Sequence, residues 1–257
     1  MVKERATMIT AQPSYLLHLA DNALILGHRN SEWCGHGPVL EQDIALTNIA
    51  LDLIGQSRYF FQYAAEQMGA DATEDSLAYL RDERSYLNFL MLELPRGDWG
   101  MTVARQFLFS HYQRLLFEGL IASKDKRIAA ISEKALKEVR YHARWSSEWM
   151  IRLGDGTEES HHRVQESLDH LWAYTSEFFL DEPFDAALLE SGIGILPSGL
   201  KDDWRGAIDP VLAEAGLKIS AGAWQHSGGR KGSHTEHLGY ILAEMQFLQR
   251  AHPGASW

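Results

Sequence analysis

Helical periodicity over long stretches is the feature of this sequence that most limits its fold. Apolar residues recur every three or four positions, and only seven prolines occur in 257 residues, so few positions force a helix to stop. No alternating pattern typical of a β-strand has a useful length. Short connections favour antiparallel neighbours, so the sequence predicts an all-α fold, a helical bundle with additional C-terminal helices. The helices are predicted near residues 13–33, 38–68, 74–94, 98–123, 127–153, 158–180, 202–215 and 233–250.

Particular residues mark the ends of these predicted helices. Thr73 and Asp98 are expected to act as N-caps, and Gly69 as a C-terminal stop. Ser233 and Glu236 have the spacing of a capping box at the start of the last helix. No linker rich in Gly, Ser or Pro interrupts the chain, so we expect a single domain over residues 1–257, with residues 1–12 as a loose N-terminal extension.

Composition excludes several classes of protein. Lys and Arg number 24 against 35 Asp and Glu, and the resulting formal charge of −11 disfavours nucleic-acid binding. The single cysteine, Cys34, excludes an internal disulfide, a Cys-rich zinc site and an iron–sulfur cluster. No apolar run approaches the roughly 18 residues of a membrane span, and the first residues do not form an apolar signal segment. We therefore expect a cytoplasmic protein without membrane or nucleic-acid partners.

The predicted helix over residues 38–68 carries a polar stripe on an otherwise apolar surface. It is apolar almost all round, which is typical of a central helix, yet Asn48, Asp52 and Gln56 lie four residues apart on it. A buried carboxylate requires a partner. An internal hydrogen-bond network and a metal ion both satisfy that requirement.

Further acids and histidines occupy apolar stripes of other predicted helices. Glu83 and Glu138 each share a stripe with apolar residues, and His111 and His142 lie on the inner faces of their helices. Together with Asp52, these side chains could point into one bundle centre. Ferritin-like di-iron sites are built in this way, with one Glu from each of two helices and Glu-x-x-His from each of the other two.

The spacing, however, lacks the expected imidazoles. Tyr86 and Tyr141 stand three residues after Glu83 and Glu138, where a di-iron site requires histidine. Acids without these histidines make a weak transition-metal site. The sequence therefore predicts no catalytic residues and a vestigial, metal-free centre. Its ligand-equivalent positions are Asp52, Glu83, Tyr86, Glu138 and Tyr141.

The alternative is an atypical metal site that recruits histidine from elsewhere. His111 and His142 would then complete a ligand set with the three acids, and the chain would be an autonomous ferritin-like metalloenzyme. A histidine in a helical core is more often packed and hydrogen-bonded than bound to metal.

Several segments in order along the chain resemble a known family, the C subunits of bacterial phenylacetyl-CoA epoxidase. The resemblance covers about residues 21–257, and the combination of motifs is specific. It implies a ferritin-like fold and a structural, non-catalytic role beside a catalytic A subunit that holds the di-iron centre. A small B subunit and a reductase that supplies NADPH electrons complete the implied complex, and the isolated chain could form a homo-oligomer. The matching segments are residues 31–36, 48–56, 81–84, 137–142, 231–239 and 242–246.

A Gly-rich basic loop precedes the last predicted helix. Such a loop at a helix N-terminus can bind phosphate, so Arg230 and Lys231 are candidate contacts for the phosphates of a CoA ester held by a partner. A flexible connector is the simpler interpretation. His234 and His237, three residues apart, have a spacing that can bind metal, but a helix-entry network or a contact with a partner protein is favoured.

Overall fold

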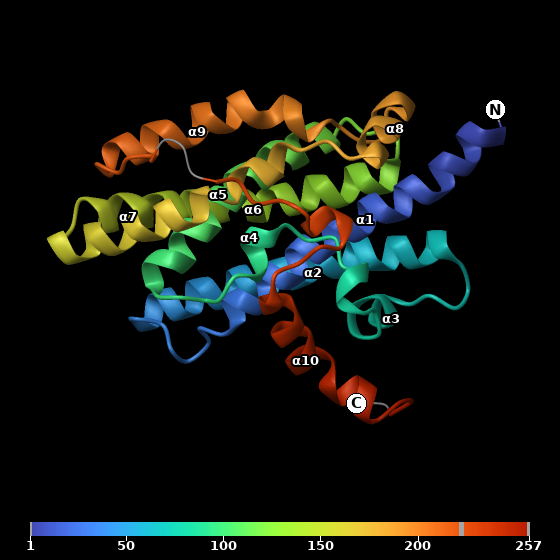
Figure 1. The fold of residues 1–257 in the computed structure, drawn as a ribbon, viewed down its shortest axis with the longest axis horizontal. Coiled ribbons are helices and arrows are strands. Elements are labelled where there is room, and N and C mark those ends of the chain that lie inside the picture. The colour runs from blue at the N-terminus through green and yellow to red at the C-terminus, as the bar shows by residue number, and fades with distance from the viewer. Residues whose placement is uncertain (1, 221–223, 256–257) are drawn as a thin grey trace. The chain divides into compact units, whose positions relative to one another are not determined.

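The computed structural model describes residues 2–220 and 224–255, and within these ranges the regular structure is entirely helical (Figure 1). This confirms the predicted all-α class. The contacts divide the chain into two compact units: Met1–Pro95 with Gly228–Trp257, and Arg96–Ser227. The prediction of a single domain stays a prediction. No helix of the described residues is long and apolar enough to cross a membrane.

The first unit is organised around a pair of long helices. α1 (Val2–Ser31) packs along α2 (Leu40–Met68), and the two join through a turn that contains Cys34. α3 (Glu74–Tyr79), the 3-10 turn η1 (Glu83–Ser85) and α4 (Leu90–Glu93) follow. The chain returns to this unit at η4 (Gly229–Lys231) and at α10 (Glu236–Ala251), which packs on α3, α4 and η1.

The second unit is built on another long pair, α5 (Trp99–Leu120) with α6 (Lys126–Gly154). Asp98 caps α5 as predicted, because its side chain accepts a hydrogen bond from the Met101 amide. The remaining elements of this unit are α7 (Glu158–Trp172), η2 (Thr175–Phe179), α8 (Pro183–Ser191), η3 (Pro197–Leu200) and α9 (Lys201–Glu214). α9 packs on both long helices, and its buried Trp204 donates through Nε1 to the Leu108 carbonyl at 3.0 Å.

Several helix ends differ from the sequence predictions. α1 begins at Val2 and contains Pro13, so the helical backbone extends into the stretch expected as a loose extension. The predicted capping box of Ser233 and Glu236 is wrong. Thr235 is the N-cap of α10, and its hydroxyl accepts from the His237 amide at 3.3 Å. The predicted caps Gly69 and Thr73 are confirmed.

The largest correction concerns residues 74–94. We expected one continuous helix there, but the structure has two short helices and a 3-10 turn, joined by extended backbone. The predicted helical stripe that Glu83 would share with Leu80, Leu87 and Leu90 therefore does not form. The physical reason lies in side chains of α1, which bind the backbone of this segment.

Candidate functional site

Three polar side chains on one face of α1 are buried in the first unit. His18, Asp21 and Asn22 lie about one helical turn apart, and each is at most 3% exposed. They point toward residues 80–89, the stretch between α3 and α4 that contains η1 and extended backbone around it. Because polar groups without partners are costly in a core, their contacts decide the local structure.

These side chains form hydrogen bonds with backbone amides and carbonyls that would otherwise pair with one another in a helix. Asp21 accepts from the Leu87 amide at 2.8 Å, and the Asn22 carbonyl oxygen accepts from the Phe89 amide at 2.8 Å. His18 donates through Nδ1 to the Leu87 carbonyl at 2.7 Å. With its donors and acceptors satisfied in this way, the segment stays extended although its apolar pattern favours a helix.

Asp21 also forms a buried ion pair with Arg81. Both terminal nitrogens of the guanidinium donate to the two carboxylate oxygens, and the Asp21 side chain is fully buried. Arg81 lies 4.2 Å from the ring centroid of Tyr86 and 5.3 Å from that of Phe61. Burial lowers the pKa of Arg81, but the charge and hydrogen bonds of Asp21, with a further contribution from Tyr86, together raise it more, so the net shift is upward. Burial raises the pKa of Asp21, although Arg81 and the Leu87 amide lower it. Because a guanidinium stays protonated in proteins and donates to both carboxylate oxygens, we describe the pair as ionic.

A second buried pair joins α4 to the start of α10. His234 contacts a Glu93 carboxylate oxygen through Nδ1 at 2.8 Å and the Tyr86 carbonyl through Nε2 at 2.8 Å. Glu93 also accepts from the Asn88 amide group at 2.8 Å and from the Thr235 backbone at 2.6 Å.

The partners of His234 fix its charge. Glu93 is surrounded by donors and is therefore an ionised carboxylate. Since Glu93 and the Tyr86 carbonyl both accept, both ring nitrogens of His234 carry protons, and the ring is an imidazolium. Burial lowers the pKa of His234, but the hydrogen bond and charge of Glu93 raise it more, so the net shift is upward. We call the five residues of this network the ionic cluster: His18, Asp21, Arg81, Glu93 and His234.

The predicted metal positions in the first unit do not provide a suitable donor set for iron. Asp52 is half-buried on α2, and Glu83 lies on η1. The Tyr86 hydroxyl is buried, donates to the Ala78 carbonyl and accepts from the Gln246 amide at 3.1 Å. Burial raises the pKa of Tyr86, which disfavours the phenolate that would bind a metal.

The predicted positions in the second unit also differ from one another in exposure and in hydrogen-bond partners. Glu138 is half-buried and Tyr141 is exposed on α6, while His142 of the same helix is buried. His111 contacts the Ser147 hydroxyl through Nε2 at 2.9 Å, and burial, with a smaller effect from Arg114, lowers its pKa to about 4. Among the described residues, no group of three or more His, Cys, Asp or Glu side chains is placed to hold a metal ion.

The Gly-rich loop has a packing role that its sequence did not reveal. A Cβ on Gly229 would lie 2.0 Å from the Asn88 carbonyl oxygen, and one on Gly232 would lie 2.2 Å from that of Arg84. Arg230 is 4% exposed, whereas Lys231 is exposed. The glycines thus allow the loop to approach the backbone of residues 84–88. A phosphate contact by Arg230 or Lys231 stays a prediction.

The ionic cluster was missed at the sequence level, apart from His234. Its signals were polar residues inside apolar runs: His18 and Asp21 among the apolar residues of α1, and Glu93 between Leu92 and Leu94. His237, by contrast, is half-buried at the first turn of α10 and outside the cluster.

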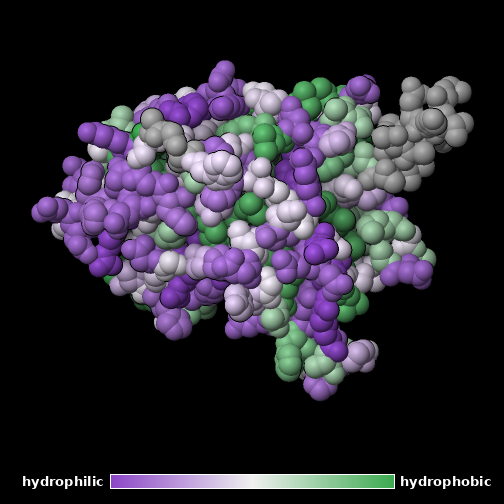
Figure 2. Space-filling view, viewed as in Figure 1, coloured by the Kyte–Doolittle hydropathy of each residue, from purple (hydrophilic) through white to green (hydrophobic). Residues whose placement is uncertain are grey.

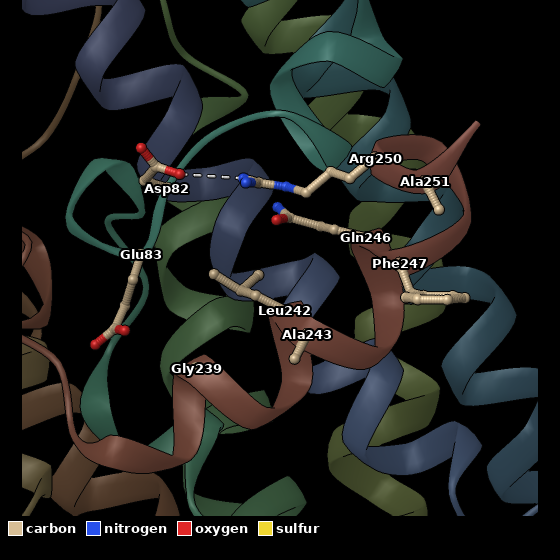
Figure 3. Close-up of a pocket in the computed structure, with 9 residues that line it drawn as sticks. All are labelled: Asp82, Glu83, Gly239, Leu242, Ala243, Gln246, Phe247, Arg250 and Ala251. Carbon is tan, nitrogen blue, oxygen red and sulfur yellow. Dashed lines mark hydrogen bonds and ion pairs between the residues drawn. The ribbon is translucent and has the colours of Figure 1, made fainter. Parts of the chain in front are cut away.

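A groove lies between η1 and α10 in the same unit (Figure 3). Its volume is about 510 Å³, and Gly239, Leu242 and Ala243 of α10 line its centre. Glu83 lies at one end and Arg250, paired with Asp82 at 3.2 Å, at the other. The groove is open and mainly apolar, as expected of a surface that contacts another molecule.

The sequence as a whole matches known proteins over nearly its full length. It matches the family described as phenylacetic acid catabolic protein over residues 2–257. The C subunit of the 1,2-phenylacetyl-CoA epoxidase of Escherichia coli (strain K12) is 47% identical over 244 residues, which cover 95% of this chain and 98% of that relative. The family has a ferritin-like helical fold, which confirms the predicted architecture and the resemblance. The chain therefore belongs to the phenylacetic acid catabolic protein family.

Proposed function

We propose that this chain is the structural, non-catalytic subunit of a multicomponent di-iron monooxygenase that epoxidises the ring of phenylacetyl-CoA in aerobic phenylacetate degradation. The observation that carries the proposal is the 47% identity to the E. coli C subunit along 98% of its length. The proposed partners are a catalytic A subunit, a small B subunit and a reductase. A cytoplasmic location fits the need for NADPH and the single cysteine of the chain.

In this proposal the di-iron centre belongs to the A subunit, where it supplies O₂ activation, and the electrons of NADPH arrive through the reductase. The residues of this chain support that division of roles. Tyr86 stands where a di-iron site needs histidine, and its hydroxyl is engaged with Ala78 and Gln246. The donor set is thus that of a packed core, and the centre is vestigial.

The ionic cluster gives the chain what a structural subunit requires. One buried pair joins α1 to the segment between α3 and α4, and the other joins α4 to the start of α10, both through hydrogen-bonded charges. Such networks hold helices in one arrangement, and a stiff helical surface helps a partner keep its metal ligands in place.

Reconstitution of the complex tests this proposal. The purified A and B subunits and the reductase should oxidise NADPH in response to phenylacetyl-CoA at least about tenfold faster with this chain than without it, as expected when a partner fixes catalytic geometry. Glu138→Gln in this chain should leave the rate unchanged. If the chain forms no complex with the A subunit, or if its omission leaves activity intact, the proposal is wrong.

The same materials address the autonomous metalloenzyme. Iron analysis of the isolated chain is expected to show substoichiometric metal that does not change with Glu138→Ala. Stoichiometric iron lost on this substitution would favour a metal site that uses Asp52, Glu83, Glu138, His111 and His142.

A further inference from the structure

A small pocket lies among α1, α2 and α3 of the first unit and shares no lining residue with the groove beside α10. Its volume is about 170 Å³. Leu24, Phe61 and Ala78, each at most 7% exposed, form its floor, and Ile54 adds another apolar side chain. Figure 2 shows hydrophobic residues among hydrophilic ones on the surface around α3 and α10, whereas the floor of this pocket is mainly apolar. The pocket can therefore hold a small apolar group away from water.

One polar side chain, Ser57 of α2, also lines the pocket. The residue is 1% exposed, and its Oγ makes no hydrogen bond with any part of the chain that the structure describes. A serine in a helix often bonds back to a carbonyl of the preceding turn, but this one does not. Since a buried hydroxyl without a partner destabilises a fold, a ligand that offers it a hydrogen bond gains affinity.

The charged residues at the mouth of the pocket disfavour an anion. Arg58 donates through Nε to Glu74 Oε1 at 2.9 Å, and this pair joins α2 to α3. The exposed Asp75 adds a second acid, so one cation stands against two carboxylates. Burial, with a smaller effect from Asp75, raises the pKa of Tyr79, so the fourth polar residue of the mouth is a neutral hydroxyl. The Arg58 side chain is 65% exposed, and such a pair is weak enough to move when a ligand enters.

We propose that this pocket binds a monocyclic arene that carries one uncharged hydroxyl group, the class of which phenol is the simplest member. The ring packs on Leu24, Ile54 and Phe61, and its hydroxyl exchanges a hydrogen bond with Ser57 Oγ. An apolar cavity of about 150 Å³ in another protein binds benzene, so about 170 Å³ accommodates a ring with one small substituent. Phe61 also offers the ring an aromatic neighbour.

The bound ligand contacts three helices at once. It therefore holds the short helix α3 against the α1–α2 pair and stabilises the first unit. The inference uses only this pocket and does not depend on the proposed epoxidase role.

Titration of the full-length chain with three probes of similar size tests the proposal. Phenol should bind with a dissociation constant of about 1 mM, because so small a ligand makes few contacts. Toluene, which lacks the hydroxyl, should bind no more tightly than phenol. Benzoate should bind at least about tenfold more weakly, because its charge meets the acids of the mouth. The methyl resonances of Leu24 and Ile54 should shift on binding, since a ring current acts on protons beside the ring.

Two serine variants identify the hydrogen bond. Ser57→Ala should weaken phenol binding about tenfold and leave toluene binding unchanged. Ser132→Ala is the matched control: Ser132 lies on α6, is fully buried, and its hydroxyl likewise has no partner among the described residues. It should leave phenol binding unchanged. Both substitutions remove an unsatisfied hydroxyl, so circular dichroism should show both variants folded.

Three results would overturn the proposal. The first is methyl resonances of Leu24 and Ile54 that do not move at phenol concentrations about tenfold above the expected dissociation constant. The second is an equal effect of Ser57→Ala and Ser132→Ala on phenol binding. The third is benzoate that binds as tightly as phenol.

Discussion

His234 and Glu93 are 141 residues apart in sequence and form a buried ion pair at 2.8 Å. Both side chains are completely shielded from solvent. This contact holds the start of α10 against α4, so the last helix belongs to the same unit as the first. Because the pair requires a protonated His234, the stability of this unit also depends on pH.

Replacement of His234 by Ala should lower the free energy of unfolding by about 3 kcal/mol at pH 6, because Glu93 is left as a buried charge without its cation. Urea denaturation followed by circular dichroism measures this. The neighbouring His237→Ala, on a half-buried side chain outside the cluster, is the control and should change stability by less than about 0.5 kcal/mol. Equal losses in the two variants would contradict the role of the ion pair.

The stability of the wild-type chain should fall as the pH rises. The folded pKa of His234 lies above its unfolded value of about 6.5, so its contribution is complete below that pH and is lost as the pH rises through the folded pKa. Urea midpoints between pH 6 and pH 9 or so test this direction. His234→Gln should remove this part of the pH dependence, and a midpoint difference that is constant across the range would argue against it.

Asp21→Asn should destabilise the protein by about 3 kcal/mol, since it removes the charge that neutralises buried Arg81. Asp82→Asn is the matched substitution at an exposed pair, where Asp82 is 86% exposed and faces Arg250. It should cost no more than about 0.5 kcal/mol. Thermal unfolding of the two variants in parallel gives the comparison, and a larger loss for Asp82→Asn would be inconsistent with the cluster.

His111 should produce the opposite pH effect. Its folded pKa of about 4 lies below the unfolded value, so its neutral form stabilises the fold above about pH 6.5 and that contribution decreases as the pH falls toward 4. The loss should reach about 3 kcal/mol near pH 4, and His111→Gln should reduce it. The control substitution His252→Gln, at an exposed position, should leave the loss of stability at low pH unchanged. NMR titration of the His111 ring provides a direct check.

Local signals were enough to predict most helices. Asp98, Thr73 and Gly69 mark the ends of helices because capping is decided by one or two neighbouring residues. Likewise, the apolar periodicity of residues 98–123 and 127–153 predicted the long helices α5 and α6. These elements are determined by residues that lie close to them in the sequence.

The site could not be predicted in the same way, because its contacts join distant segments. The amides of Leu87 and Phe89 find their acceptors on Asp21 and Asn22, more than sixty positions earlier, so local propensity favoured a helix that tertiary contacts replace. Glu83 was consequently placed on a helical stripe that does not exist, with Tyr86 at a ligand-equivalent position three residues later. His234 was noticed for its spacing to His237, whereas its actual partner is Glu93.

The return of the chain at Gly228 has a consequence for folding during synthesis. Glu93 leaves the ribosome long before His234 is made, and domains generally begin to fold from their N-terminal end. Until the last segment emerges, the nascent first unit holds a carboxylate whose cation has not been translated. A chain that stops before residue 234 would keep that defect permanently, which gives cellular proteolysis a means to distinguish truncated copies from complete ones.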